Sequence, residues 1–332
     1  VWGANTARPG SVNYVEGQVT LNGAPLNSTS IGVAEVQPGQ MLETQQGKAE
    51  MLLTPGVFIR LDDNSRLKMI NPSLIDTRVE LVHGKAMLEV TELMKENHIV
   101  VLDAGATTTV EKRGLYEFDA NNPRVSVYDG EALVTADDKQ IKLKKGRETA
   151  LTGRLHAQKF DRKYEDSLYA WSNVRSETLS QASTSYARAY VGGGWGYPGW
   201  GYPGWYGAGW YWNPWFDMYS FIPGDGIFYS PFGWGFYSPG FIGYAPLYYG
   251  GVYYGGHYLR GGHYNGHGTQ WAHGRVPAYR GSSGGAVAPH AHAFTGGHGS
   301  FGGGAFRGGG GFRGGFGGGG FHGGGFHGGG RR

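Results

Sequence analysis

The sequence predicts an all-β domain, an antiparallel β-roll, β-sandwich or short β-solenoid of many short strands, followed by one docking helix and a low-complexity tail. Three observations predict this organisation. Up to residue 160, short runs of alternating apolar and polar residues follow one another without helical patterns between them. Residues 161–190 instead carry apolar side chains at spacings of three and four. From residue 192 the chain is mainly glycine, aromatic residues and proline, and only 14 of its 63 glycines precede this segment.

The expected strands are short and are separated by turns that contain glycine. The alternation along residues 125–128 indicates a strand with one buried face. Asn22-Gly23 and Asp129-Gly130 favour two-residue hairpins, because both central residues of such a turn need positive φ. His83-Gly84 is a third expected turn. In chain order, strands are expected at residues 12–15, 18–21, 48–54, 57–61, 66–70, 79–82, 86–90, 99–102, 107–110, 115–118, 124–128 and 132–135.

Residues 161–190 are expected to form one helix of five to eight turns. Asp161 is the expected N-cap, and Gly192–Gly194 end the helix. We expect its apolar stripe to dock on the β-domain, with a partner-binding helix as the alternative. The stripe consists of Tyr164, Leu168, Trp171, Leu179, Ala182, Tyr186 and Tyr190.

This pattern divides the chain into a β-domain (1–155), a docking helix (156–190) and a tail rich in Gly, Tyr, Trp and His (191–332). We expect residues 1–190 to fold alone as a monomer. Ordering glycine costs more backbone entropy than ordering any other residue, so the tail is expected to be largely disordered when alone. The tail has seven arginines against two aspartates, whereas the rest of the chain is slightly acidic. This balance argues against nucleic acid as the partner of the β-domain.

The composition also limits the chemistry of the chain. It has no cysteine, which excludes disulfides, Cys-ligated zinc and a cysteine nucleophile. It has no run of 18 apolar residues, so no transmembrane helix is expected. Because the chain begins at Val1 rather than Met, we expect that an N-terminal signal peptide has been removed.

Motifs for catalysis and cofactor binding are weak, and neither an enzyme nor a cofactor is expected. Residues 194–199 and 199–204 match the spacing of a dinucleotide-binding loop. The proline at 198 and the following Gly-Tyr-Pro repeat exclude the helix that such a loop needs. The chain has no Gly-x-Ser-x-Gly motif, and no spacing of its acidic residues points to a glycosidase pair.

The aromatic residues at the start of the tail are the candidate contact residues. Glycine and proline separate these rings and keep them accessible, so they can stack on sugar rings or on one another. Many weak contacts of this kind add up through multivalency. The sequence therefore predicts self-association or adhesion to cell-surface polysaccharide, with a disordered spacer as the alternative. The candidates are Trp195, Tyr197, Trp200, Tyr202, Trp205, Trp210, Trp212 and Trp215.

The tail also contains nine of the twelve histidines. His290 and His292 are the best candidates for a weak metal site, because neutral imidazole suits Zn²⁺, Cu²⁺ and Ni²⁺. The simpler interpretation is that histidine serves as a polar aromatic residue in a biased composition.

Short strand and glycine segments follow one another at Gly17–Leu21, Val36–Thr44, Lys48–Leu53, Glu80–Val90, Val125–Val134 and Leu143–Arg147. In the order and spacing of these segments, residues 10–153 resemble the FecR domain family. This resemblance implies an extracytoplasmic, all-β, non-catalytic module that contacts other proteins. The chain departs from the family at residues 113–118, which read Arg-Gly-Leu-Tyr-Glu-Phe in place of Gly-Thr-x-Phe-x-Val. It also lacks the helical cytoplasmic domain and membrane helix of the iron-dicitrate sensors, so signalling across a membrane is not carried over.

These observations together predict a non-enzymatic binding module of the cell envelope or extracellular space. Its partners are other proteins or further copies of the chain, reached through the tail. A matrix or fibre protein assembled through the tail is the alternative function, and a weak metal-binding protein is a further one.

Overall fold

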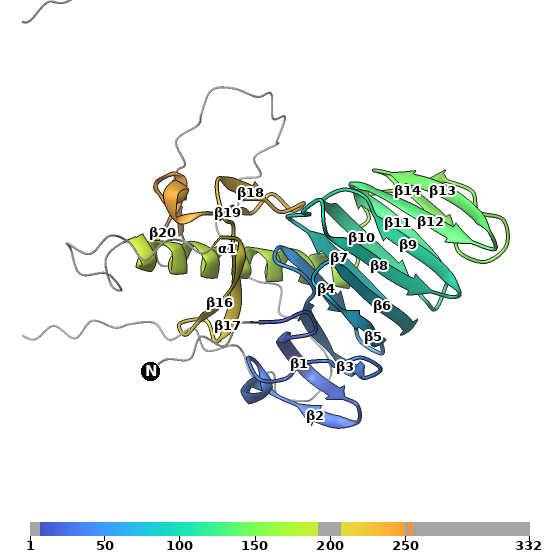
Figure 1. Cartoon of the computed structure of the whole chain (residues 1–332), viewed down its shortest axis with the longest axis horizontal. Helices are drawn as coiled ribbons and strands as arrows, with labels where there is room; N and C mark the ends of the chain where they lie inside the picture. Colours follow the sequence, from blue (N-terminus) through green and yellow to red (C-terminus); the bar gives the residue numbers. More distant parts are fainter. Residues whose placement is uncertain (1–6, 192–206, 250–251, 255–332) are drawn as a thin grey trace, which may run out of the picture. The chain divides into compact units, whose positions relative to one another are not determined.

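The computed structural model describes residues 7–191, 207–249 and 252–254 (Figure 1). The β-domain contains β1 (Val12–Leu21), β2 (Ala24–Leu26), β3 (Met41–Leu52), β4 (Val57–Leu61), β5 (Arg66–Pro72), β6 (Asp76–His83), β7 (Lys85–Val90), β8 (His98–Asp103), β9 (Ala106–Val110), β10 (Gly114–Asp119), β11 (Arg124–Asp129), β12 (Glu131–Ala136), β13 (Lys139–Lys144), β14 (Arg147–Ala150) and β15 (Gln158–Lys159), with a 3-10 turn at Ser28–Ser30. After them come α1 (Ser167–Val191), β16 (Gly209–Asn213), β17 (Met218–Ile222), β18 (Ile227–Tyr229), β19 (Gly235–Tyr237), a 3-10 turn at Pro239–Tyr244, β20 (Leu247–Tyr249) and β21 (Val252–Tyr254).

The fifteen strands of the β-domain form one sheet that folds over into two layers. The first layer has the order β13-β12-β9-β8-β6-β5, and the second has the order β4-β7-β10-β11-β14-β15. β3 belongs to both layers, because Met41–Glu43 pair with β5 and Ala49–Leu52 pair with β4. All neighbours on this path are antiparallel except β6 and β8, which are parallel. The prediction of an all-β antiparallel roll or sandwich is confirmed.

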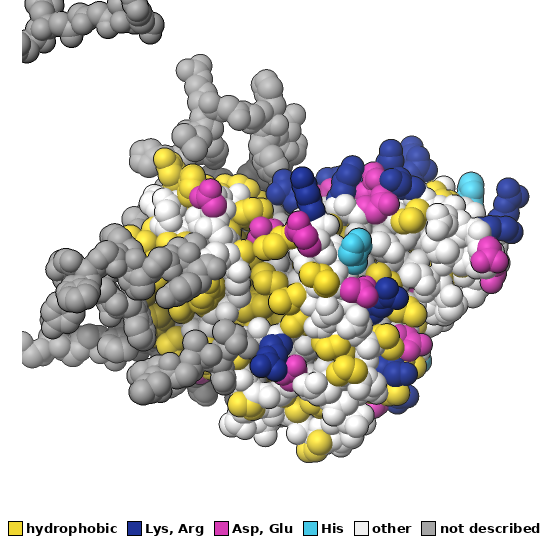
Figure 2. All heavy atoms as spheres, viewed as in Figure 1, with side chains coloured by type: hydrophobic (Ala, Val, Ile, Leu, Met, Phe, Trp, Pro, Cys, Tyr) yellow, Lys and Arg dark blue, Asp and Glu magenta, His cyan; other side chains and the backbone are white. Residues whose placement is uncertain are grey.

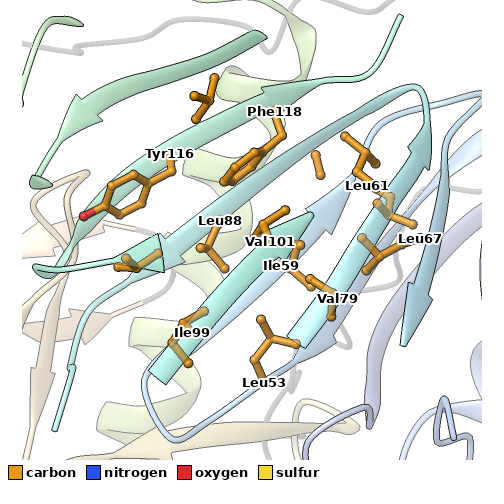
Figure 3. Packing of buried hydrophobic residues seen from close by; sticks show 14 of the residues in the cluster. Leu53, Ile59, Leu61, Leu67, Val79, Leu88, Ile99, Val101, Tyr116 and Phe118 are labelled. Atoms are coloured by element: carbon orange, nitrogen blue, oxygen red, sulfur yellow. The ribbon is translucent and has the colours of Figure 1, made fainter. Parts of the chain in front are cut away.

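One hydrophobic core lies between the two layers. Figure 3 shows side chains of the second layer, such as Leu88 and Phe118, among side chains of the first layer, such as Val79 and Val101. These residues alternate with others that point away from the core, as the strand period of two requires. In the first layer the outward residues reach solvent, and Arg78 of β6 is an example.

Two of the predicted turns are corners between the layers. β11 pairs with β10 and β14, whereas β12 pairs with β9 and β13, so the prediction of a hairpin at Asp129-Gly130 is wrong. His83-Gly84 likewise connects β6 of the first layer to β7 of the second. Gly130 has φ +95° and lies so close to the Tyr116 hydroxyl that a side chain there would clash. By contrast, Asn22-Gly23 forms the predicted hairpin between β1 and β2, with φ values of +52° and +84°.

The helix α1 begins later than the sequence predicts. Asp161 is not its N-cap, because residues 161–164 form a separate turn in which Asp161 accepts a hydrogen bond from the Lys163 backbone. Asp166 caps the helix instead, accepting a hydrogen bond from the backbone N–H of Tyr169 at 2.9 Å. Tyr164 therefore lies outside the helix and is 70% exposed.

The helix lies on the outer face of the second layer. Leu168 packs with side chains of β7, β10 and β11, and Leu179 and Ala182 pack with side chains of β3 and β4. The rest of its buried face is mainly small and polar, since it includes four serines and Thr184. Ser176 and Ser180 use their hydroxyl groups to bond Glu89 and the carbonyl of Gly235. This face thus contacts its neighbours through hydrogen bonds as well as apolar packing.

Residues 207–249, within the segment of low sequence complexity, pack against the helix and the β-domain. β16 and β17 form one antiparallel hairpin, and β18 and β19 form another. Five of their side chains join one buried cluster with Leu52 and Phe58 of the β-domain. As a result every residue of β4 is buried. The core covers one side of this strand, and the five side chains, which we call the cover, shield the other side. The five side chains are Trp210, Met218, Tyr219, Phe221 and Phe236.

Candidate functional site

A buried network of charged side chains lies between the second layer and α1. The Arg60 Nε atom is 2.8 Å from Glu50 Oε2, and its Nη1 atom is 2.6 Å from Glu89 Oε2. Arg175 of α1 adds a second guanidinium, with Nη2 3.0 Å from Glu50 Oε1. The side chains of Arg60 and Glu50 are wholly inaccessible to solvent, and that of Arg175 is 6% exposed. The two positive and two negative charges balance, as burial of ions in a low-dielectric interior requires.

The network reaches the aromatic hairpin through Asn13. The Asn13 Nδ2 atom donates to Glu50 Oε1 at 3.0 Å and to the Tyr219 carbonyl at 3.2 Å. Its Oδ1 atom accepts from the Tyr219 backbone N–H at 2.8 Å. The Asn13 amide therefore pairs with β17 as the backbone of a neighbouring strand would. One connected set of bonds joins β1, β3, the helix and the hairpin.

The charges in this network set the protonation of Glu50. Burial alone would raise the pKa of the Glu50 carboxyl group, but the charges and hydrogen bonds of Arg175 and Arg60 hold that pKa below its ordinary value. The glutamate is thus ionised, and it acts as an acceptor for both guanidinium groups. The network is suited to holding α1 on the β-domain, because removal of any one charged side chain leaves a buried charge unpaired.

The structure describes three of the eight predicted aromatic contact residues, and these three differ in exposure. Trp210 is 6% exposed and packs edge-on against Phe58, with ring centroids 5.0 Å apart. Trp212 packs against Tyr219, whereas Trp215 is 60% exposed. Trp195, Tyr197, Trp200, Tyr202 and Trp205, together with His290 and His292, lie outside the described residues.

Three further aromatic side chains share the exposure of Trp215. Tyr229 is 56% exposed, Tyr244 is 58% exposed, and Phe241 is 37% exposed and packs beside Tyr244. Figure 2 shows hydrophobic side chains gathered over the part of the molecule formed by α1 and the hairpins, whereas charged side chains gather over the β-domain. We call Trp215, Tyr229, Phe241 and Tyr244 the aromatic surface.

The sequence analysis did not identify the charged network or most of the aromatic surface. A signal for the network was present, because Arg60 interrupts an apolar run at 57–61 that otherwise reads as a fully buried strand. Glu50 and Glu89 interrupt two other strands in the same way. The partner of these residues on α1 could not be identified, since Arg175 follows 125 residues after Glu50.

Asp103 is a buried carboxyl group outside this network, and it makes stability depend on pH. It is 1% exposed, and neither carboxylate oxygen has a hydrogen-bond partner among the described residues. Burial, with a contribution from the charge of Asp119, raises the pKa of Asp103 to about 7 from 3.8. Between these two pKa values the folded chain binds a proton that the unfolded chain has lost, so the contribution of Asp103 to stability is fully present below about pH 4 and is lost as the pH rises through 7.

We expect Asp103→Asn to remove this decline. At pH 8 the free energy of unfolding should rise by roughly 4 kcal/mol, and at pH 4 it should hardly change. Denaturant unfolding at the two pH values measures both. Glu80→Gln, at an exposed site, is the control. Equal effects of Asp103→Asn at pH 4 and pH 8 would contradict the prediction.

Within the residues that the structure describes, no helix is long and apolar enough to span a bilayer. The same residues contain no group of three or more His, Asp or Glu side chains that could hold a metal ion.

Comparison with known proteins gives matches within the β-domain. No curated protein matches the chain. Two crystal structures from Parabacteroides distasonis, each described as a "putative anti-sigma factor", resemble it. The first shows 15% identity and a TM-score of 0.34, and the match covers 40% of this chain and 64% of that one. The second shows 13% identity and a TM-score of 0.32, over 44% of this chain and 71% of that one. This chain thus spans slightly less than two thirds of the first structure's length.

A family model described as FecR protein matches residues 40–133. This range runs from the turn before β3 into β12, and it includes the corner glycines at 84 and 130 and three members of the charged network. The resemblance noted in the sequence is therefore confirmed: residues 40–133 of this chain match the FecR family model.

Proposed function

We propose that this chain is a non-enzymatic, extracytoplasmic binding module that associates with further copies of itself through its aromatic surface. The FecR domain supports a role in binding or signalling rather than catalysis. The observation that carries the proposal is the exposure of Trp215, Tyr229 and Tyr244 on a segment fixed to that domain. Large aromatic side chains held outward on a rigid support are typical of contact surfaces.

The fixed position of the hairpins supports an effective contact surface. Exposed rings on a flexible chain lose conformational freedom when they bind, and this loss opposes association. Here the hairpins are packed against Phe58 and bonded to Asn13, so much of the ordering has already taken place. The same rings could stack on sugars, and cell-surface polysaccharide is therefore a second partner of matching chemistry.

Sedimentation velocity of the full chain tests the proposal. We expect the wild type to form assemblies and Trp215→Ser/Tyr229→Ser/Tyr244→Ser to shift the distribution towards monomer. Tyr164→Ser is a matched control, since Tyr164 is 70% exposed but lies before the helix. Unchanged thermal unfolding of the triple variant would show that the fold is intact. Assemblies of equal size in both proteins would contradict the proposal.

Three further samples separate the alternatives. If the chain is a matrix or fibre protein assembled through its later residues, truncation after residue 254 abolishes assembly and the triple variant does not. If His290 and His292 join chains through a metal ion, a chelator dissociates the assemblies. Dissociation by soluble polysaccharide would instead show that sugars compete for the same rings.

A further inference from the structure

A cavity of about 660 Å³ opens beside the corner at Gly130. Its walls come from four loops of the β-domain, which contribute Glu92, Arg113, Asp129 and Lys145 among others, and from Phe228 of β18. Phe228 of the docked hairpin thus completes a wall that is otherwise formed by the β-domain. Its volume is within the range of small-molecule and peptide sites.

Most charged groups that line the cavity are already paired. Lys145 Nζ is 2.8 Å from Asp129 Oδ1, and Lys112 Nζ is 3.3 Å from Glu131 Oε2. Glu111 pairs with Lys142 at 2.8 Å. These pairs compensate one another and leave little net charge on this part of the wall.

Two groups of opposite sign remain. The Arg113 guanidinium makes no ion pair with any of the described residues and is exposed. Glu92 is half-buried and its carboxylate has no ion pair or side-chain hydrogen bond with the described residues, although its Oε2 atom is itself closed to solvent. A guanidinium binds a carboxylate through two parallel hydrogen bonds, and a carboxylate favours an ammonium group. The cavity thus offers one free site for each terminus of a zwitterion.

We propose that this cavity binds a short peptide with free termini, its carboxylate on Arg113 and its amino group near Glu92. Phe228 and Leu93 form the apolar part of the wall and fit an apolar side chain of such a peptide. A phosphate or another anion fits less well, because it would lie in one cavity with Glu92. A free amino acid carries the same two charged termini as a short peptide. Probes of different length therefore distinguish these two ligands.

Isothermal titration calorimetry of the full chain with Phe, Gly-Phe and Gly-Gly-Phe tests this site. We expect a dipeptide or tripeptide to bind, and N-acetylation or C-terminal amidation of that peptide to weaken binding at least about tenfold. Arg113→Gln should remove the preference for the free carboxylate only, and Glu92→Gln the preference for the free amine only. Lys139→Gln, at an exposed position on β13, should leave binding unchanged.

The outcomes are distinct. Binding of a peptide that loses its end-group preferences one by one in the two variants supports the proposal. Binding of Phe alone, no binding of any probe at millimolar concentration, or equal affinity for blocked and free peptides overturns it. Because each titration reports one ligand and one site, the result does not depend on whether the chain self-associates.

Discussion

Truncation after residue 190 is expected to destroy cooperative unfolding, whereas truncation after residue 254 should preserve it. The shorter chain loses five buried side chains that cover Leu52 and Phe58. Burial of a large apolar side chain contributes about 1.5–3 kcal/mol, so the total loss is comparable to the roughly 5–15 kcal/mol that stabilises a typical domain. The sequence pattern predicts that residues 1–190 are self-sufficient, and the packing of β16–β19 leads to the opposite expectation.

Thermal unfolding followed by circular dichroism measures this difference. The chain ending at 254 should show one sharp transition at the temperature of the full chain. The chain ending at 190 should melt broadly and bind a dye for exposed apolar surface, because the outer face of β4 is uncovered. Identical sharp transitions for the two truncated chains would show that the hairpins contribute little to stability.

The second large effect is expected for Glu50→Ala. This change leaves Arg60 with one carboxylate and Arg175 with none in the buried network. Breaking a buried ion pair by removing one partner typically costs about 3–5 kcal/mol, since the remaining charge is desolvated and unpaired. We therefore expect chemical denaturation to give a free energy of unfolding lower by about that amount.

Glu43→Ala is the matched control for this prediction. Glu43 pairs with Arg66 at 2.9 Å in the same sheet, but both side chains are substantially exposed. Exposed ion pairs contribute about 0–1 kcal/mol, so the control should be nearly neutral. The double change Glu50→Ala/Arg175→Met should cost less than the sum of its single changes, because it removes both members of one pair. A strictly additive double variant would show that Arg175 does not act through Glu50.

The strands were predictable from the sequence because the first layer alternates between core and solvent. β6, for example, alternates regularly between buried and more exposed residues. In the second layer, β4, β7 and β10 are buried on both faces, so their burial does not alternate, and charged residues such as Arg60, Glu89 and Glu117 interrupt their apolar runs. The positions of these strands can still be predicted from their lengths and from the turns between them, but the residues that cover their outer face cannot.

The cover was not predicted because the composition of this segment favours disorder, whereas its tertiary contacts favour an ordered structure. The glycine content after residue 192 favours disorder, yet Trp210 and Phe221 are among the residues that complete the cluster around Phe58. Tertiary contacts therefore outweigh local tendency at residues 207–249. Similarly, the corners at Gly84 and Gly130 have the local sequence of hairpins, and only the pairing of distant strands makes them crossovers between layers.

The bonds of Asn13 also have a consequence for the order of folding. Asn13 and Tyr219 are separated by 206 residues along the chain, and Glu50 and Arg175 by 125. Contacts between such distant residues slow folding, because a long loop must close before they form. During synthesis from the N-terminus, β4 and β7 are complete long before their cover exists. We therefore expect a late, slow folding phase that begins only when about two thirds of the chain has been made.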